Sequence, residues 1–243
     1  MQTLDQITRY LIAAISMPVF LGGAILIAPV SANWSWHLVR FWNRLVLAIF
    51  GIEYEVRFES EAARYKDGGV VVGLTQQSIL DPTVGYAAWD RPVKSIWNIE
   101  YALIPFFGWV TFTLGWIIVR QWPAQAKRQI EKAAQYAANG GLVYLSAEGQ
   151  RSDDGKLQAY KKGPVVMAIQ AQVPLYPTYI AGSRSCLTPG EWRIRPGKIV
   201  IHNLSPISTE GYQYKDRDEL FDKIRQIGER EHAKWSAVSE DQW

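Results

Sequence analysis

A strand-like segment that ends in a polar cluster is the part of this chain best suited to chemistry. Residues 70–74 are apolar and rich in β-branched side chains, which predicts a buried strand. The sequence Thr-Gln-Gln-Ser-Ile-Leu-Asp follows at 75–81. In α/β folds, ligand-binding and catalytic sites usually lie at the carboxyl ends of the strands. Gln76 can position a hydroxyl by hydrogen bonding, but its amide does not titrate and cannot act as a general base. Asp81 is either a residue of this site or the cap of a helix that begins with Pro82.

Two arginines follow other strand-like segments. Residues 115–119 lead into Arg120, and residues 142–146 lead into Glu148, Gly149 and Arg151. Because each arginine follows an apolar strand, we expect an anion site rather than paired surface charges. Glu148 is either a reactant or a salt-bridge partner of one of these arginines. Gly149 is expected to be needed for a backbone conformation that favours glycine.

Composition limits the classes of function. The 243 residues suit one ordinary domain, and nearly half of them are hydrophobic. The net charge of +3 fits an anionic membrane surface or a phosphate ligand. Nucleic-acid binding is not expected, because no basic run is interleaved with stacking aromatics. Cys186 is the only cysteine and the three histidines are widely spaced, so we expect no disulfide and no metal site.

The N-terminal region predicts membrane association. Residues 10–30 carry no charge, and about 20 apolar residues can cross a bilayer core. Pro18 and the Gly22-Gly23 pair are expected to kink or loosen this helix.

The next segment, residues 34–50, is amphipathic and is expected to lie in the membrane interface. Three arrangements are open for the two helices. The first helix spans the membrane, with Arg40 and Arg44 keeping the following domain on the cytoplasmic side; or both helices form a re-entrant pair; or they form a buried hairpin of a soluble core. An aromatic belt is predicted from three tryptophans: Trp34, Trp36 and Trp42.

From residue 53 the pattern is that of an α/β domain, which divides the chain into membrane-associated helices at 1–52 and a second domain at 53–243. Strands are predicted at 54–58, 70–74, 93–97, 115–120, 142–146 and 173–180, and a hairpin at 192–202 with Pro196-Gly197 as its turn. Helices are predicted after Asp81 and at 123–139, 160–171 and 216–234. This alternation predicts a layered, mostly parallel mixed sheet flanked by helices.

The polar cluster at 75–81 resembles the first motif of the glycerolipid acyltransferases, the family of 1-acylglycerol-3-phosphate acyltransferase. That motif reads Asn-His-Gln-Ser, two free positions and Asp. Gln77, Ser78 and Asp81 match it, whereas Gln76 occupies the histidine position.

Three further segments resemble the remaining motifs in the family's order, and the N-terminal helices are also similar. They are Pro105-Phe106-Phe107-Gly108 with Gly115 and Arg120, Glu148-Gly149 with Arg151, and the proline-containing strand at 173–177. Several positions depart from the family pattern. Asn98 replaces a lysine, Arg120 falls near the usual aspartate with Gln121 near the usual arginine, and Ser146, Ala147 and Gln150 replace Phe, Pro and Thr.

The resemblance implies transfer of a fatty acyl group from acyl-CoA or acyl carrier protein to a hydroxyl of a lysophosphatidate-like lysophospholipid, in phospholipid biosynthesis or remodelling. It implies a catalytic domain on the cytoplasmic face of a membrane, or its organellar equivalent, and no metal or bound cofactor. In the family the histidine takes the proton of the acceptor hydroxyl, and the aspartate orients the histidine. Gln76 and Asp81 therefore mark the catalytic position. The resemblance assigns substrate binding to Ser78, Arg120, Glu148, Gly149 and Arg151.

Three explanations of Gln76 remain open. The chain is a catalytically impaired member that serves as a lipid-binding or structural subunit of a membrane complex; or the glutamine was introduced into an active enzyme; or Asp81 or Glu148 supplies the base. The other departures favour natural divergence. An interfacial hydrolase is less well supported, because Ser78 lacks the flanking glycines of a nucleophile elbow.

Overall fold

The computed structural model describes residues 2–65, 67–119 and 121–238, and within them seven strands form one sheet. The strand order is β1-β7-β6-β2-β5-β3-β4. Neighbours are parallel except for the antiparallel pair β6 and β7. The strands are β1 (Ile52–Phe58), β2 (Gly69–Gly73), β3 (Val93–Asn98), β4 (Gly115–Ile118), β5 (Leu142–Ser146), β6 (Leu175–Ala181) and β7 (Gly197–Asn203). The predicted mixed α/β sheet is confirmed.

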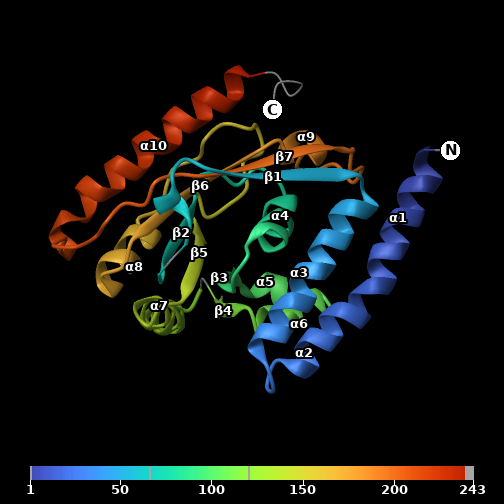
Figure 1. Cartoon of the computed structure of the whole chain (residues 1–243), viewed down its shortest axis with the longest axis horizontal. Helices are drawn as coiled ribbons and strands as arrows, with labels where there is room; N and C mark the ends of the chain where they lie inside the picture. The colour runs from blue at the N-terminus through green and yellow to red at the C-terminus, as the bar shows by residue number, and fades with distance from the viewer. Residues whose placement is uncertain (1, 66, 120, 239–243) are drawn as a thin grey trace.

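Helices cover both faces of the sheet (Figure 1). One apolar cluster joins the sheet to α7, α8 and α10, and two others join its opposite face to α3 and α4. The helices that follow β1 are α4 (Leu80–Ala88), α5 (Ile99–Ala102), α6 (Phe107–Thr111), α7 (Pro123–Ala138), α8 (Gly163–Ala171), α9 (Ser183–Cys186) and α10 (Arg217–Ala237), with short 3₁₀ turns at Glu61–Ala63 and Tyr214–Asp216.

The N-terminal helix is interrupted where the sequence predicts it. α1 (Gln2–Met17) continues through a π-helical turn at Pro18–Gly22 into α2 (Gly23–Ile27). Proline has no N–H to donate, so the regular ladder cannot pass through Pro18. The helical run Thr3–Ile27 is long and apolar enough to cross a membrane. Large apolar side chains of this run are exposed: Leu4, Ile7, Leu11, Ile12, Ile15, Val19 and Leu26.

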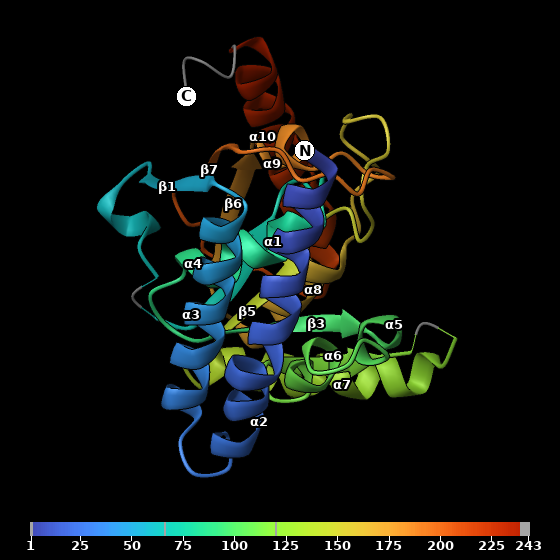
Figure 2. The same ribbon diagram turned by 90° about the vertical axis from the view of Figure 1, so that its right-hand side faces the viewer.

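The third helix, α3 (Ala32–Ile49), runs beside α1 and packs on α4 (Figure 2). Trp36 and Trp42 are 3% and 6% exposed, so the predicted aromatic belt is wrong for both, and Trp34 alone of the three is exposed. Their burial follows from the amphipathic pattern, which directs this face of α3 toward the core.

The two arginines of α3 bind the carboxyl end of α4. Arg44 Nε donates to the carbonyl oxygen of Ala87 at 2.9 Å, and Arg40 Nε donates to the same oxygen at 3.4 Å. Cations are stabilised at helix C-termini, where carbonyl groups lack partners. These contacts give Arg40 and Arg44 a structural role within the protein.

The predicted hairpin at 192–202 is wrong. The segment before Gly197 forms no strand, and Arg195 N–H donates instead to the carbonyl oxygen of Cys186 at 2.8 Å. β7 begins at Gly197 and lies between β1 and β6. Both of its edges are therefore occupied by strands distant in sequence, which leaves no edge for a local hairpin partner.

The strands that carry the motifs end at one edge of the sheet. β2 lies between β5 and β6, with Gly73 paired to Ser146 and Thr178. β3 is parallel to β5 and ends at Asn98. Because parallel strands share a carboxyl edge, the polar segments after β2 and β5 emerge side by side.

Candidate functional site

Glu148 joins the two polar segments. Its Oε2 accepts a hydrogen bond from the backbone N–H of Gln76 at 2.6 Å, and its Oε1 accepts one from the backbone N–H of Gln158 at 2.7 Å. Glu148 is 1% exposed. A buried carboxylate needs such donors, and here backbone amides supply them. Backbone amides are the partners of both oxygens and no ion pair joins Glu148 to Arg151, so the predicted salt bridge is wrong for Arg151, whereas Arg120 lies outside the described residues.

Asp81 holds the start of the same segment from the other side. Its Oδ2 accepts from the backbone N–H groups of Gln77 at 2.7 Å and Ser78 at 3.1 Å. α4 begins at Leu80 with Ile79 as its N-cap, so Asp81 lies inside the first turn and is not the cap. Asp81 is 3% exposed, and its Oδ1 has no hydrogen-bond partner among the described residues. This buried oxygen is available to a donor placed at the tip of β2.

Burial controls the ionisation of both carboxylates. Burial raises the pKa of Asp81 to about 6, against the opposing effects of the Ser183 hydroxyl, the two backbone N–H groups and the Arg151 guanidinium. Ser183 Oγ does not reach hydrogen-bond geometry with Asp81, so we regard its effect as weak. Burial also raises the pKa of Glu148, while its two backbone donors act in the opposite direction. Both groups therefore ionise less readily than exposed carboxyls.

The side chain of Gln76 lines a cavity of about 370 Å³ at this sheet edge. One wall of the cavity is aromatic and consists of Tyr86, Trp89, Trp97, Tyr101 and Tyr144. The other lining residues include a set of polar groups, namely Ser95, Asn98, Glu100, Ser146, Gln150 and Arg151. Apolar cavities with a few fixed polar groups are typical of small-molecule sites.

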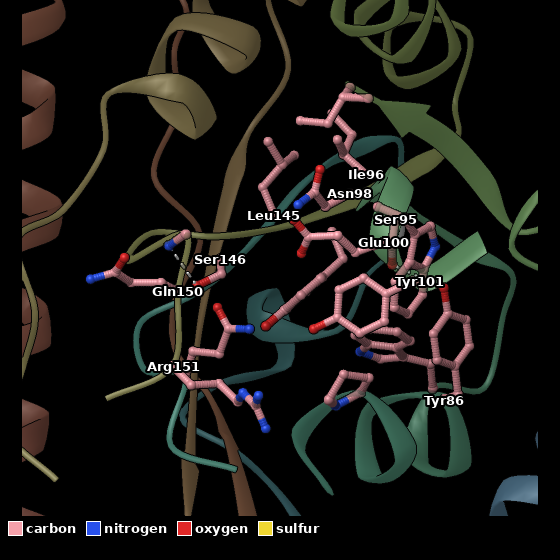
Figure 3. A pocket seen from close by; sticks show the side chains of 17 residues that line it. Tyr86, Ser95, Ile96, Asn98, Glu100, Tyr101, Leu145, Ser146, Gln150 and Arg151 are labelled. Atoms are coloured by element: carbon pink, nitrogen blue, oxygen red, sulfur yellow. Dashed lines mark hydrogen bonds between the residues drawn. The ribbon is translucent and has the colours of Figure 1, made fainter. Parts of the chain in front are cut away.

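Arg151 supplies a cation to this cavity. It is exposed, and none of the described residues makes a hydrogen bond or ion pair with its guanidinium. Glu100 lies on the opposite side of the cavity (Figure 3). A guanidinium presents a planar set of donors suited to phosphate or carboxylate. Arg120, the second predicted cation, lies outside the described residues.

The remaining predicted residues are placed differently. Gly149 lies at the cavity with φ 68°, a backbone conformation that favours glycine, which confirms the expected backbone role. Ser78 does not line the cavity; its buried hydroxyl donates to the carbonyl oxygen of Leu187 at 2.8 Å. Asn98 does line it, and its Oδ1 accepts from the N–H of Ile99 to cap α5.

Sequence reasoning missed the aromatic wall. Tyr144 lies on β5, ahead of Glu148 in the loop that follows, and Trp97 lies on β3 next to Asn98, so both are near the carboxyl edge of the sheet. Strand periodicity places Tyr144 on the same face as Leu142, which is buried against the α4 side of the sheet. The alternation of side chains along the strand predicts this face for Tyr144, but it does not distinguish a cavity wall from ordinary core packing.

The sequence of this region matches a known protein family. The profile of a family described as Acyltransferase matches residues 55–181, which is more than half of the chain. The chain belongs to this acyltransferase family. The matched region includes both polar segments and the strands β2 to β6.

Curated relatives carry one recurring name. The chain is 31% identical over 164 residues to a 1-acyl-sn-glycerol-3-phosphate acyltransferase of Chlamydomonas reinhardtii, covering 66% of this chain and 47% of that protein. It is 26% identical over 188 residues to the Limnanthes alba protein of that name, covering 75% and 64% respectively. The matches thus span about half to two thirds of these relatives.

A solved structure shows the same fold. The 1-acyl-sn-glycerophosphate acyltransferase of Thermotoga maritima superposes with a TM-score of 0.82 at 20% identity, over 98% of this chain and 97% of that one. The similarity extends through the N-terminal helices, because nearly the whole of both chains is covered.

Proposed function

We propose that this protein transfers a fatty acyl group from acyl-CoA or acyl carrier protein to a hydroxyl of a lysophosphatidate-like lysophospholipid, in phospholipid biosynthesis or remodelling. The observation that carries this proposal is the joint placement of Gln76 and Arg151 at one cavity. Asp81 lies directly behind the segment that presents Gln76. The cavity thus offers a hydroxyl-positioning amide, a cation and an apolar wall in one place.

Each part of the acceptor has a matching group. The phosphate would bind the free guanidinium of Arg151 through charge-assisted hydrogen bonds. Arg120 remains the predicted second cation. The Gln76 amide would accept a hydrogen bond from the attacking hydroxyl, and the aromatic wall would pack against apolar parts of the substrates. The proposed transfer uses no metal or bound cofactor, as the family resemblance implies.

The acceptor and the acyl chain would reach the site from a membrane. The exposed apolar face of α1 and α2 continues on α5 and α6, since α2 contacts α6. The exposed residues of that second region are Leu103, Ile104, Trp109 and Phe112. They follow Glu100 and Tyr101 of the cavity lining, so the cavity would open beside the lipid phase. We expect the domain on the cytoplasmic face or its organellar equivalent.

A second candidate rests on Gln76 itself. An amide cannot take the proton, and loss of a general base typically costs about 10²–10⁴ in rate. The alternative is a catalytically impaired member that binds lipid or supports a membrane complex. Positioning and electrostatic stabilisation remain in the site, so we favour slow turnover over none.

An acyl-transfer assay separates the two candidates. Purified full-length protein in mixed micelles is given palmitoyl-CoA or palmitoyl-acyl carrier protein with a panel of lysophospholipids, and free thiol and ester product are both measured. Acceptor-dependent ester formation supports the acyltransferase. Absence of product from the native chain, together with product from Gln76→His, supports the impaired member. Absence of product from both contradicts this acceptor class.

A further inference from the structure

Tyr144 places a hydroxyl at the tip of β2. Tyr144 pairs with Val71 in the register of β5 and β2, yet its side chain reaches over Gly73, nearer the carboxyl edge. A Cβ at Gly73 would stand 2.2 Å from Tyr144 Oη, so only glycine leaves room for the phenol there. The hydroxyl therefore lies just before the segment that carries Gln76.

This hydroxyl has no protein partner. Two buried tyrosines of the fold are satisfied: Tyr86 donates to Ser95 Oγ at 2.9 Å, and Tyr160 donates to the carbonyl oxygen of Leu74 at 2.5 Å. By contrast, Tyr144 is half-buried and lines the cavity together with Gln76, and its Oη makes no hydrogen bond with the described residues. An unpaired hydroxyl at a cavity wall is available to a ligand.

Its surroundings keep the hydroxyl protonated. Burial raises the pKa of Tyr144, and the nearby carboxylates of Asp81 and Glu148 act in the same direction. Each carboxylate accepts two backbone N–H groups, and neither accepts a hydrogen bond from the phenol, so the hydroxyl remains available to a ligand. Tyr144 is therefore a hydrogen-bond donor at neutral pH and not a base.

We propose that Tyr144 Oη donates a hydrogen bond to the carbonyl oxygen of the bound acyl thioester, while Gln76 Oε1 accepts from the acceptor hydroxyl. This role rests on the proposed function. The acceptor oxygen adds to the thioester carbon and the carbonyl electron pair moves to oxygen, where the phenol stabilises it. The C–S bond then breaks, and the acceptor's proton ends on the departing sulfur, giving ester and thiol.

The ring is held before substrate arrives. Gly73 lies against one end of the phenol, and the ring packs against Trp89 with centroids 5.4 Å apart at 50°. A donor fixed in this way does not need to reorganise as charge develops. The hydroxyl of Tyr144 would thus stabilise the carbonyl oxygen while the amide of Gln76 positions the acceptor, in a site that lacks a titrating base.

The test removes only the hydroxyl. Tyr144→Phe keeps the ring, and Tyr136→Phe on α7 is the matched control, since Tyr136 is half-buried against Trp116 and does not line the cavity. Both substitutions are made in the native chain and in Gln76→His. We expect Tyr144→Phe to lower kcat for acyl transfer about 10²-fold in whichever background turns over. Tyr136→Phe should leave kcat unchanged.

A spectroscopic readout does not depend on turnover. The probe is a ketone analogue of palmitoyl-CoA, in which CH₂ replaces the sulfur and the ketone carbon is ¹³C-labelled. Its infrared carbonyl stretch should move to lower frequency on binding the native chain and return toward the micelle value in Tyr144→Phe. The native chain alone already provides a test, because a bound carbonyl with an unshifted stretch overturns the role of Tyr144.

The outcomes separate this inference from the function on which it rests. Equal kcat and equal carbonyl frequencies in Tyr144→Phe and the native chain overturn the role of Tyr144 while acyl transfer stands. Failure of the analogue to bind any variant, together with no ester from either background, contradicts acyl transfer itself and removes the basis for the role of Tyr144.

Discussion

The backbone N–H of Gln76 donates to Glu148 Oε2 at 2.6 Å, which joins two segments 72 positions apart in the chain. The other carboxylate oxygen holds the N–H of Gln158. Glu148 is therefore a clamp that fixes the loop on which Gln76 is presented.

Glu148→Gln should loosen this clamp. A glutamine side chain can accept at only one end, so the N–H of Gln76 or of Gln158 would face an NH₂ group and lose its partner. We expect the free energy of unfolding to fall by about 1–3 kcal/mol, the typical cost of an unsatisfied buried donor. Urea unfolding in detergent micelles measures it, with Glu131→Gln on the exposed face of α7 as the control. Equal midpoints for the two variants would contradict the clamp.

Asp81 should make stability depend on pH between about 4 and 6. Its pKa is raised from 3.8 to about 6 in the fold, so in this range the folded state binds more protons than the unfolded state. Stability therefore falls as pH rises through this range, by about 3 kcal/mol in total for a pKa change of this size.

Asp81→Asn removes the titrating group and should remove that fall. The measurement is urea unfolding at pH 4, 5, 6 and 7, with Asp222→Asn on the exposed part of α10 as the control. The difference in unfolding free energy between Asp81→Asn and the native chain should grow in favour of the variant as pH rises. Parallel pH curves would show that burial does not raise the pKa of Asp81.

Gly73→Ala should destabilise the fold through Tyr144. The added Cβ would lie 2.2 Å from Oη and 2.9 Å from Cζ, so the ring or the strand must shift. Overpacking of this kind typically costs about 1–3 kcal/mol. In a Tyr144→Phe background the nearest atom is gone, and the cost should be smaller.

Gly163→Ala is the control, since a Cβ there meets nothing within 4 Å. A double-mutant cycle over Gly73 and Tyr144 by urea unfolding gives the coupling. Zero coupling would mean that the phenol does not occupy the space over Gly73.

Arg151→Gln should impair binding of an acceptor phosphate. Hydrogen bonds to charged groups contribute about 1.5–3 kcal/mol, which corresponds to a rise in KM of roughly 10- to 100-fold for lysophosphatidate. The KM for an uncharged monoacylglycerol should change little, because that acceptor has no phosphate. Arg128→Gln, on the exposed face of α7, controls for loss of surface charge. An equal rise for both acceptors would place Arg151 outside phosphate recognition.

Local patterns predicted the elements around the site well. The apolar strand before Gln76, the glycine conformation at Gly149 and the interruption at Pro18 each depend on neighbours in sequence. All three appear in the structure as expected. The position of Asp81 beside the Gln76 segment also follows from a separation of a few residues.

Long-range packing determined what the sequence could not predict. Trp36 and Trp42 resemble interface residues by type, but α3 turns them into the core against α4. The segment before Gly197 has strand-like residues, but β7 is already paired on both sides. The partners of Glu148 and the space that Gly73 leaves for Tyr144 likewise depend on segments brought together only by the sheet.

The pH–rate profile of Gln76→His, with and without Asp81→Asn, tests the central claim most directly. An imidazole at position 76 would find the free Oδ1 of Asp81 as its orienting partner. We predict acyl transfer about 10²–10⁴-fold faster than in the native chain, rising with pH through a pKa near neutrality, and loss of most of that gain in the double variant. A Gln76→His chain no faster than the native one, or a gain that Asp81→Asn leaves intact, would contradict this assignment of the site.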